Sequence, residues 1–427
     1  MRGAAIPIVL LLAAAWARPV GAQAPEPPNE VDLGEVIRMA RSSANPRVRA
    51  IAVRARTARA ELVEASVHPN PSLSYTFTGP LRGPNTLDGS QHFVGLDQPI
   101  LLSGQRAARQ RAAERRVQAA EARADAELMS LVRDARHLYV NLLLAQKSLQ
   151  IKQRSLETLE RVRRIVETRS TLRGSSRYDA LRLDVEQSAL GAELERQRAE
   201  IEDAGARLGA LLGRPGWSPR ARGKLDPGRS ALPPAVAVHA LQRSNPELVA
   251  ALREASAAES EIDAANRDAW PVPTLGIGAL MTTEPRSIAG VVGVTIPLPA
   301  FDRAQGARSR ARAEAAAAEA EQRAVRAEIV AEAQRAARQL ALKKATLERL
   351  DRSALARLPA LTAMAEDAYR EGVGGVVALL DASSAERDLL LDRASLAAEV
   401  MHAEIDVLAL TGAILDDSGR WGGALRR

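Results

Sequence analysis

The chain has 427 residues, enough for two or three ordinary domains, and it contains no cysteine, which excludes disulfides, thiolate metal sites and thiol catalysis. Its 59 basic and 52 acidic residues leave a net charge of +7. The basic residues alternate with Glu and Ala along predicted helices, as in Glu314–Glu328, which indicates solvated helix faces and argues against nucleic-acid binding.

The N-terminus has the pattern of a secretory signal. Arg2 supplies a positive charge, Ala4–Ala15 an apolar stretch, and Val20–Ala24 the small residues of a cleavage site. We therefore expect residues 1–24 to be a signal peptide and the mature chain to be exported. The apolar stretch is too short for a membrane anchor, and no other run reaches the ~20 apolar residues of a spanning helix.

The sequence predicts a helix over Val31–Val67, a very long helix over Gln105–Leu172, and a return helix after Arg173–Ser176. Apolar residues in the long helix recur in alternating steps of three and four, with Lys152 as the one break. The return helix keeps the same alternation, and Gln197 breaks it once. Such heptad seams predict antiparallel coiled-coil packing, with a long helix of roughly 100 Å. The seam residues are Leu128, Leu131, Ala135, Leu138, Leu142, Ala145, Leu149, Leu156 and Leu159, then Leu190, Leu194, Ile201, Ala204, Leu208 and Leu211.

The chain repeats its own plan about 200 residues later. We predict two repeats, over residues 25–213 and 235–413, joined by a linker over 214–234 and followed by a tail over 414–427. Each repeat has the order helix, strand, strand, long helix, return helix, and its two short helices, stacked end to end, would match the long one. Pro359 is expected to kink the second long helix. The recurring landmarks are Asn45-Pro46 with Asn245-Pro246, Pro69 with Pro271, Pro99 with Pro297, and Gly174 with Gly372.

Each repeat also carries a predicted β-hairpin, over residues 72–98 and 274–296. Their strands alternate between an apolar face and a small or polar face, which suits a transmembrane barrel; two soluble hairpins packed on helices are the alternative. Four strands cannot close a barrel alone, so closure requires several chains, and three copies would supply twelve strands. The residues expected to face lipid are Leu73, Tyr75, Phe77, Ile277, Val292 and Val294.

No reaction centre is recognisable in the sequence. There is no Walker phosphate loop and no G-x-S-x-G turn. We therefore expect no catalytic residue, no cofactor and no resident metal. The five histidines lie far apart in the sequence, and no pair has metal-ligand spacing; they are His68, His92, His137, His239 and His402.

The order and spacing of these elements resemble the TolC-type outer membrane efflux family over about residues 30–413. The most specific piece is Tyr369-Arg370-Glu371-Gly372 followed by Leu379-Leu380-Asp381-Ala382, which is similar to the second helical tip of that family. Leu73-Ser74-Tyr75 and Thr295–Pro299 before a basic helix start also match. The segment through Gly104-Gln105-Arg106 is most similar to the cation-efflux branch typified by CzcC.

The resemblance implies a mainly α protein with a small β-barrel part. Three chains would form a 12-stranded outer membrane barrel that continues into a periplasmic α-helical tunnel. Such a homotrimer is a passive exit duct for metal cations or drugs, in contact with outer membrane lipid and engaged by a periplasmic adaptor and an inner membrane pump of the RND type. It is not an enzyme and binds no nucleic acid.

The resemblance also assigns roles at the far end of the helices. Asp381 is expected to line the closed entrance, whereas Gly374 and Ala378 stand where some members carry charged gating residues, so we do not expect a gate built on ionic links. The turns expected to dock the adaptor are Arg173, Gly174 and Ser175, and Glu371, Gly372 and Val373. The alternatives are plain helix caps at these turns and, for the whole chain, a soluble periplasmic coiled-coil scaffold or adaptor without channel activity. An envelope hydrolase is disfavoured because no nucleophile–base pattern is present.

Overall fold

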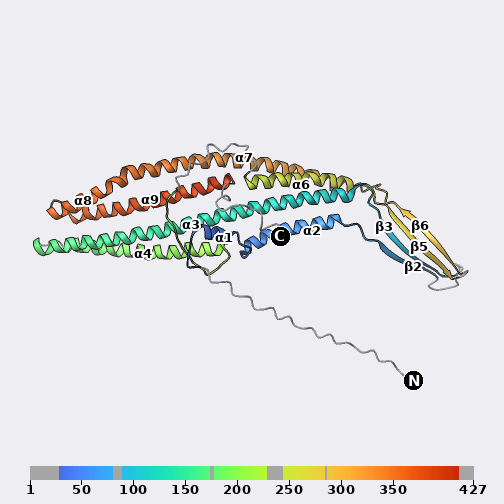
Figure 1. The fold of residues 1–427 in the computed structure, drawn as a ribbon, viewed down its shortest axis with the longest axis horizontal. Coiled ribbons are helices and arrows are strands. Elements are labelled where there is room, and N and C mark those ends of the chain that lie inside the picture. The colour runs from blue at the N-terminus through green and yellow to red at the C-terminus, as the bar shows by residue number, and fades with distance from the viewer. Residues whose placement is uncertain (1–27, 80–88, 174–176, 228–243, 284–285, 413–427) are drawn as a thin grey trace, which may run out of the picture.

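A computed structural model describes residues 28–79, 89–173, 177–227, 244–283 and 286–412, and for 168–173 the backbone only. The expected signal peptide, Gly174, Ser175 and the C-terminal tail lie outside these residues. Figure 1 shows an elongated molecule in which long helices run side by side and a four-stranded sheet projects from one end.

The first half contains α1 (Leu33–Ala40), α2 (Pro46–Ser66), α3 (Gln105–Arg173) and α4 (Arg177–Leu211). The prediction of one helix over Val31–Val67 is wrong. Val31 lies in a two-residue strand, β1 (Glu30–Val31), which pairs in parallel with β4 (Arg220–Ala221), and the chain turns between α1 and α2. The break has a local cause: Asn45 caps α2 by accepting a hydrogen bond from the N–H of Arg47 (3.0 Å), and Pro46 occupies the first helical position.

The second half contains α6 (Pro246–Asp268), α7 (Gln305–Leu350), α8 (Ala356–Glu371) and α9 (Val376–Leu410). The kink expected at Pro359 takes the form of a π-helical segment, η1 (Asp351–Leu355), between α7 and α8. A proline lacks an N–H and crowds the carbonyl four residues before it, here that of Leu355, where the π segment ends. The long helix is therefore continuous in the first half and interrupted in the second.

In each half, the return helix and the short helix are stacked end to end along the long helix (Figure 1). The side-chain N–H of Asn45 donates to the carbonyl of Leu211 at the end of α4 (3.3 Å), and that of Asn245 donates to Leu410 at the end of α9 (3.1 Å). Both joints turn at a glycine with positive φ, Gly213 and Gly412. A Cβ on Gly213 would lie 2.3 Å from Cδ of Pro46, so the close stacking itself requires glycine.

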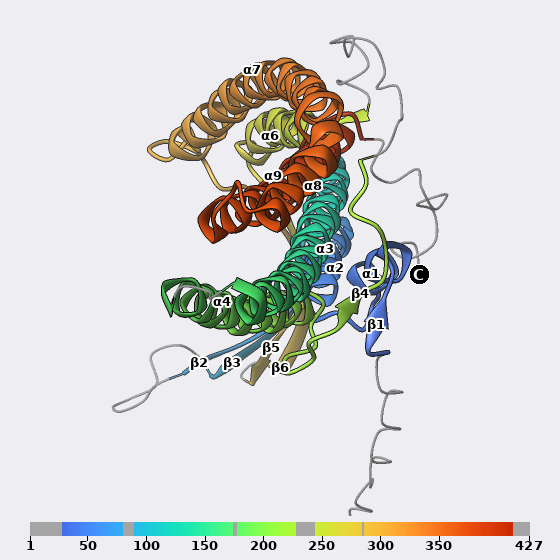
Figure 2. The ribbon, with the colours of Figure 1, turned by 90° about the vertical axis from the view of Figure 1, so that its left-hand side faces the viewer.

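The core follows α3, which packs on α2, α4, α6 and α9. Viewed along the long axis, α3 lies between α4 on one side and the helices of the second half on the other (Figure 2). Leu131, Ala135 and Leu142 of its seam are buried. The residues 198 positions later in α7, Ile329, Ala333 and Leu340, are buried as well, so the two long helices share one helical phase.

The sheet joins the two halves. Its antiparallel strands follow the order β2 (Ser72–Thr78), β3 (Gln91–Pro99), β5 (Thr274–Thr283) and β6 (Arg286–Thr295). The central pairing, β3 with β5, is between halves. Among the strands that the structure describes, β2 and β6 therefore each keep one edge unpaired. No helix within the described ranges combines the length and the hydropathy needed to cross a membrane.

Candidate functional site

All six residues expected to face lipid lie on one face of the four-stranded sheet. Directly paired residues of an antiparallel sheet share a face, and the register pairs Leu73 with Leu96, Leu96 with Ile277, and Ile277 with Val292. The face is uncovered: the exposed fraction is 76% for Leu73 and 77% for Val292. Its other members, in the same alternation, are Tyr75, Phe77, Val94, Leu275, Met281, Ile288 and Val294.

The opposite face of the sheet is small and polar where the apolar face is large. One row across it is Ser72, Asp97, Gly276 and Gly293. The larger residues on this face are Phe93, Leu280 and Val291, and the ring of Phe93 lies across neighbouring glycines: a Cβ on Gly278 would be 2.6 Å from that ring. The alternation seen in the sequence thus sorts the sheet into two chemically different faces, whereas contact with lipid stays a prediction.

The far end of the molecule carries the helical tip at Gly372. This residue ends α8 with φ of 86°, and its N–H donates to Tyr369 (3.2 Å), while Val373 and Gly374 both donate to the carbonyl of Ala368 (3.0 and 2.9 Å). The turn is a glycine-dependent helix stop that satisfies the last carbonyls of α8. Val373 is 85% exposed at its apex. Of the residues expected at the two docking turns, Glu371, Gly372 and Val373 are described in full.

The tips of the two halves pack on each other just behind this turn. Tyr369, one residue of the motif at the tip, is buried in a cluster that draws on both halves. An ion pair between Arg387 of α9 and Glu186 of α4 (3.5 Å) adds a second link. Asp381 lies on the exposed side of α9 in this region, and none of the ion pairs within the described residues involves it. The cluster consists of Leu159, Val162, Val166, Leu183, Tyr369, Val376, Leu379 and Leu380.

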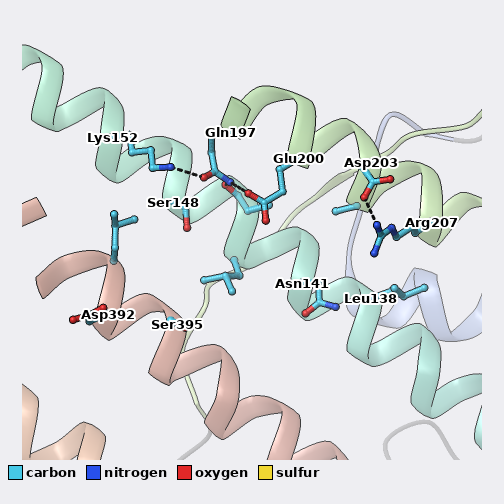
Figure 3. A pocket seen from close by; sticks show the side chains of 14 residues that line it. Leu138, Asn141, Ser148, Lys152, Gln197, Glu200, Asp203, Arg207, Asp392 and Ser395 are labelled. Carbon is cyan, nitrogen blue, oxygen red and sulfur yellow. Dashed lines mark hydrogen bonds and ion pairs between the residues drawn. The ribbon is translucent and has the colours of Figure 1, made fainter. Parts of the chain in front are cut away.

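The two polar breaks in the heptad seams are partners. The Lys152 ammonium of α3 donates to the Gln197 side-chain oxygen of α4 (3.0 Å), and the Gln197 amide donates to the carbonyl of Ala145 (3.3 Å) and to Glu200 (2.8 Å). Figure 3 shows these side chains at a cavity of about 420 Å³ between α3, α4 and α9. A buried polar pair is stable only when both members are satisfied, and a pair at matching seam positions fixes the register of two helices.

Sequence spacing missed a pair of histidines that the fold brings together. His137 of α3 and His402 of α9, one from each half, have their Nδ1 atoms 2.7 Å apart. The outer nitrogens are also bonded, His137 Nε2 to Asp406 (2.9 Å) and His402 Nε2 to the side-chain oxygen of Asn141 (2.9 Å). One excess proton satisfies this row of hydrogen bonds, whereas a second would place an N–H group on both Nδ1 atoms, face to face.

The electrostatics of the histidine pair point the same way. Burial lowers the pKa of His402, and the neighbouring His137 lowers it further. Burial raises the pKa of Asp406, but the hydrogen bond and charge of His137, together with the charges of Arg133 and His402, outweigh it, and the net shift is downward. Two histidines and one carboxylate that bonds the outer nitrogen do not form a ligand set, and the described residues contain no group of three or more His, Cys, Asp or Glu side chains arranged to hold a metal ion.

The chain is similar to known proteins along most of its length. A family model described as outer membrane efflux protein matches residues 37–214 and 237–413. The cobalt-zinc-cadmium resistance protein CzcC of Cupriavidus metallidurans is 29% identical over 300 residues, which cover 69% of each protein.

The fold is shared with solved structures of more distant sequence. The outer membrane channel CmeC of Campylobacter jejuni superposes with a TM-score of 0.77 at 13% identity, covering 91% of this chain and 87% of that one. CusC superposes with a TM-score of 0.76 at 19% identity, covering 89% and 92%. The open state of MtrE from Neisseria gonorrhoeae gives a TM-score of 0.74 at 20% identity, covering 91% of both chains.

Proposed function

This chain belongs to the outer membrane efflux protein family, and from that premise we propose that three copies of it form a passive exit duct through the outer membrane. The sheets close into one 12-stranded barrel, and the helices continue it as a periplasmic tunnel. The duct itself catalyses no reaction: a periplasmic adaptor and an inner membrane pump supply the cargo and the energy.

The observation that carries the proposal is the sheet, which has one bare apolar face and two unpaired edges. Its central pairing suggests how the edges meet. Leu96 of β3 faces Ile277 of β5. The repeat relates Leu96 to Val294 of β6, which lies 198 residues later. It relates Ile277 to Tyr75 of β2, which lies 202 residues earlier. Pairing Val294 with Tyr75 of a second copy keeps both on the apolar face, so this register extends the same surface around a ring.

Channel activity is tested by planar-bilayer recording with the purified full chain. We expect discrete, ohmic conductance steps from the reconstituted protein. The alternative, a periplasmic coiled-coil scaffold or adaptor, has no reason to conduct, so a protein that inserts and remains electrically silent would favour the scaffold. That alternative also leaves the exposed Leu73 and Val292 without an apolar environment.

The tip turns are proposed as the adaptor-docking surface. Gly372 and Val373 stand at the apex of α8 and α9, at the opposite end of the molecule from the sheet (Figure 1). A Gly372→Trp substitution places a large side chain there and strains a residue with positive φ. We expect this variant to assemble in the membrane but to lose export. Normal export by an assembled variant would leave the turn as a helix cap without a docking role. The other tip, Arg173, Gly174 and Ser175, is proposed for the same role.

Asp381 is proposed as part of the entrance. Its carboxylate is exposed on α9, roughly two turns from Gly372, so in the duct it would line the closed entrance and narrow it. Asp381→Ala is expected to raise ion leak through reconstituted channels, with Glu386→Ala on the same helix as the control. Unchanged leak would remove Asp381 from the entrance.

The cargo is proposed to be metal cations, with drugs as the alternative. The support is the relative whose name records cobalt, zinc and cadmium resistance. A strain that lacks the gene should become sensitive to Co²⁺, Zn²⁺ or Cd²⁺ and regain resistance with the gene on a plasmid. Sensitivity to drugs alone would assign the duct to a drug pump instead.

A further inference from the structure

We propose that α2 of a second copy packs on α7 in the register in which α6 packs on α3 within the chain. This contact places Glu64 of the second copy beside Arg310 and Arg54 of the second copy beside Glu321. The inference rests on the proposed trimer and deepens it, because it names the helices and the charged side chains that select the neighbouring copy.

The contact inside the chain sets the register. The antiparallel helices α3 and α6 are joined by a ladder of ion pairs that includes Arg109–Asp268 (2.8 Å), Arg116–Glu261 (2.5 Å) and Arg123–Glu254 (2.8 Å). Beside the ladder, Ala108 and Ala112 of α3 bury Ala264 of α6 in a small apolar cluster. Small residues on both helices allow this close approach, and the ladder fixes its position along the axis.

The repeat supplies the equivalent positions. Buried residues of α7 follow those of α3 by 198 positions, as Leu340 follows Leu142. Residues of α2 precede those of α6 by 200 positions: Asn45 and Asn245 both cap their helices and bond the end of a return helix, and Val48 and Leu248 are both buried. Each offset is thus fixed by packing or by a cap, independently of the other.

With these offsets, the faces that meet inside the chain are bare at their equivalents. Ala250, Ala257 and Ala264 of α6 are buried, whereas Ala50, Thr57 and Glu64 of α2 are exposed. In the same way, Ala108, Ala112, Ala119 and Ala122 of α3 are buried, whereas Gly306, Arg310, Ala317 and Ala320 of α7 are exposed. Glu64 and Arg310 line one cavity of a single chain, but the open edges of β6 and β2, which continue from the same two helices, favour a second copy of this chain as the occupant of both bare faces.

The charges on the bare faces are complementary. The pair Arg123–Glu254 has Glu321 and Arg54 as its equivalents, which is the same attraction with the signs exchanged. The apolar contact of Ala112 with Ala264 becomes Arg310 with Glu64. Within the described residues, Arg310, Glu64 and Glu321 take part in none of the ion pairs. Arg54 pairs with Glu127, and the Arg54 side chain is 65% exposed.

One of the equivalent pairs consists of two negatively charged residues. Glu314 and Glu61 correspond to Arg116 and Glu261. Glu61 shares the Arg116 guanidinium (3.3 Å) with Glu261 (2.5 Å), which weakens its repulsion from Glu314 without cancelling it. The exchange of signs at one rung and the new charges at another distinguish the α2–α7 contact from the α3–α6 contact, which disfavours the exchange of one pairing for the other.

The register is tested by cysteine cross-linking of the full chain, which has no cysteine of its own. The double variant Glu64→Cys, Arg310→Cys should form covalent dimers and trimers under mild oxidation, because disulfides need Cα atoms within about 7 Å. The matched control pairs Glu64→Cys with Arg312→Cys: two positions further along α7 is about 200° around the helix, so this pair should stay uncrosslinked.

The mass of the protein before oxidation distinguishes failure of the proposed register from failure of the proposed trimer. A trimer that cross-links equally through Arg312→Cys, or not at all through Arg310→Cys, overturns the proposed register and leaves the duct intact. A monomer refutes the proposed trimer itself.

Charge exchange gives a second test. Arg310→Glu and Glu64→Arg should each speed dissociation of the detergent-solubilised trimer by roughly two- to five-fold, and the double exchange should restore the original rate. If the effects of the two single variants simply combine, without rescue, the two side chains do not meet.

Discussion

The two halves of this chain share one plan and differ in how fully their long helices are covered. In the first half, α3 packs on α2, α4, α6 and α9, and side chains are buried along much of its length. In the second half, α7 packs on α6 and α9, and its buried residues fall along a single line from Ala311 to Leu347. In the proposed trimer, the duplicated chain places one repeat contact inside itself and leaves the equivalent contact for another copy.

Equivalent core side chains of the two halves should contribute equally to stability. Leu142 and Leu340 are 198 residues apart, and both have no exposed surface. Leu142→Ala and Leu340→Ala should each lower the free energy of unfolding by about 2–5 kcal/mol, because each leaves a cavity in a packed seam. Chemical denaturation followed by circular dichroism measures both. A large loss from one and none from the other would end their equivalence.

The hairpins of both halves contribute to one apolar face of the sheet. A charged residue placed on that face tests whether it contacts lipid. Tyr75→Arg and Val292→Arg, one in each hairpin, should strongly reduce assembled protein in the outer membrane fraction, since Arg on a lipid face costs about 2–4 kcal/mol at mid-membrane. Thr76→Arg lies on the opposite face of the same strand and should be milder. Equal losses on both faces would argue for hairpins packed against protein.

The end-to-end joints of the two halves should also be equivalent, with a smaller effect on stability. Asn45→Ala and Asn245→Ala each remove a helix cap and a hydrogen bond to the end of the return helix of the same half. Each should cost about 0.5–2 kcal/mol in thermal or chemical unfolding, by the same amount in both halves. A difference of more than a factor of about two would show that one joint is held mainly by other contacts.

The smallest expected effect concerns the histidines that join the halves. The pKa of His402 is lowered in the folded chain, so the unfolded chain takes up more protons as pH falls below about 6.5. Stability should therefore decline by a small amount between pH 7.5 and 5.5. His402→Gln should remove part of that decline. Melting temperatures measured across this range would contradict the account if this variant followed the unmodified chain.

The sequence predicted those features whose signal is local or periodic. Strand alternation at Ser72–Thr78 located one hairpin, the heptad steps located the buried seams, and Gly372 marked a tip, because each depends on near neighbours along the chain. The predicted long helix over Val31–Val67 is wrong because apolar content outweighs the Asn45-Pro46 break, although the same dipeptide is one of the repeat landmarks.

What the sequence did not yield depends on pairs that only the fold brings together. Lys152 and Gln197 were each recognised as breaks in a seam, but nothing along the chain indicates that they bond to each other. His137 and His402 lie on different halves, so no spacing rule relates them. The helical phase of α7 relative to α3 likewise follows only from which residues are buried, since the sequence landmarks allow offsets of 198, 200 or 202.

In the proposed trimer, the contacts that one chain lacks are made by other copies. The most direct measurement is the mass of the full-length protein extracted from outer membranes in detergent, by light scattering with the detergent contribution subtracted. The account predicts a protein mass of three chains that is unchanged on dilution. A single-chain mass, in protein that remains stable without detergent, would contradict it.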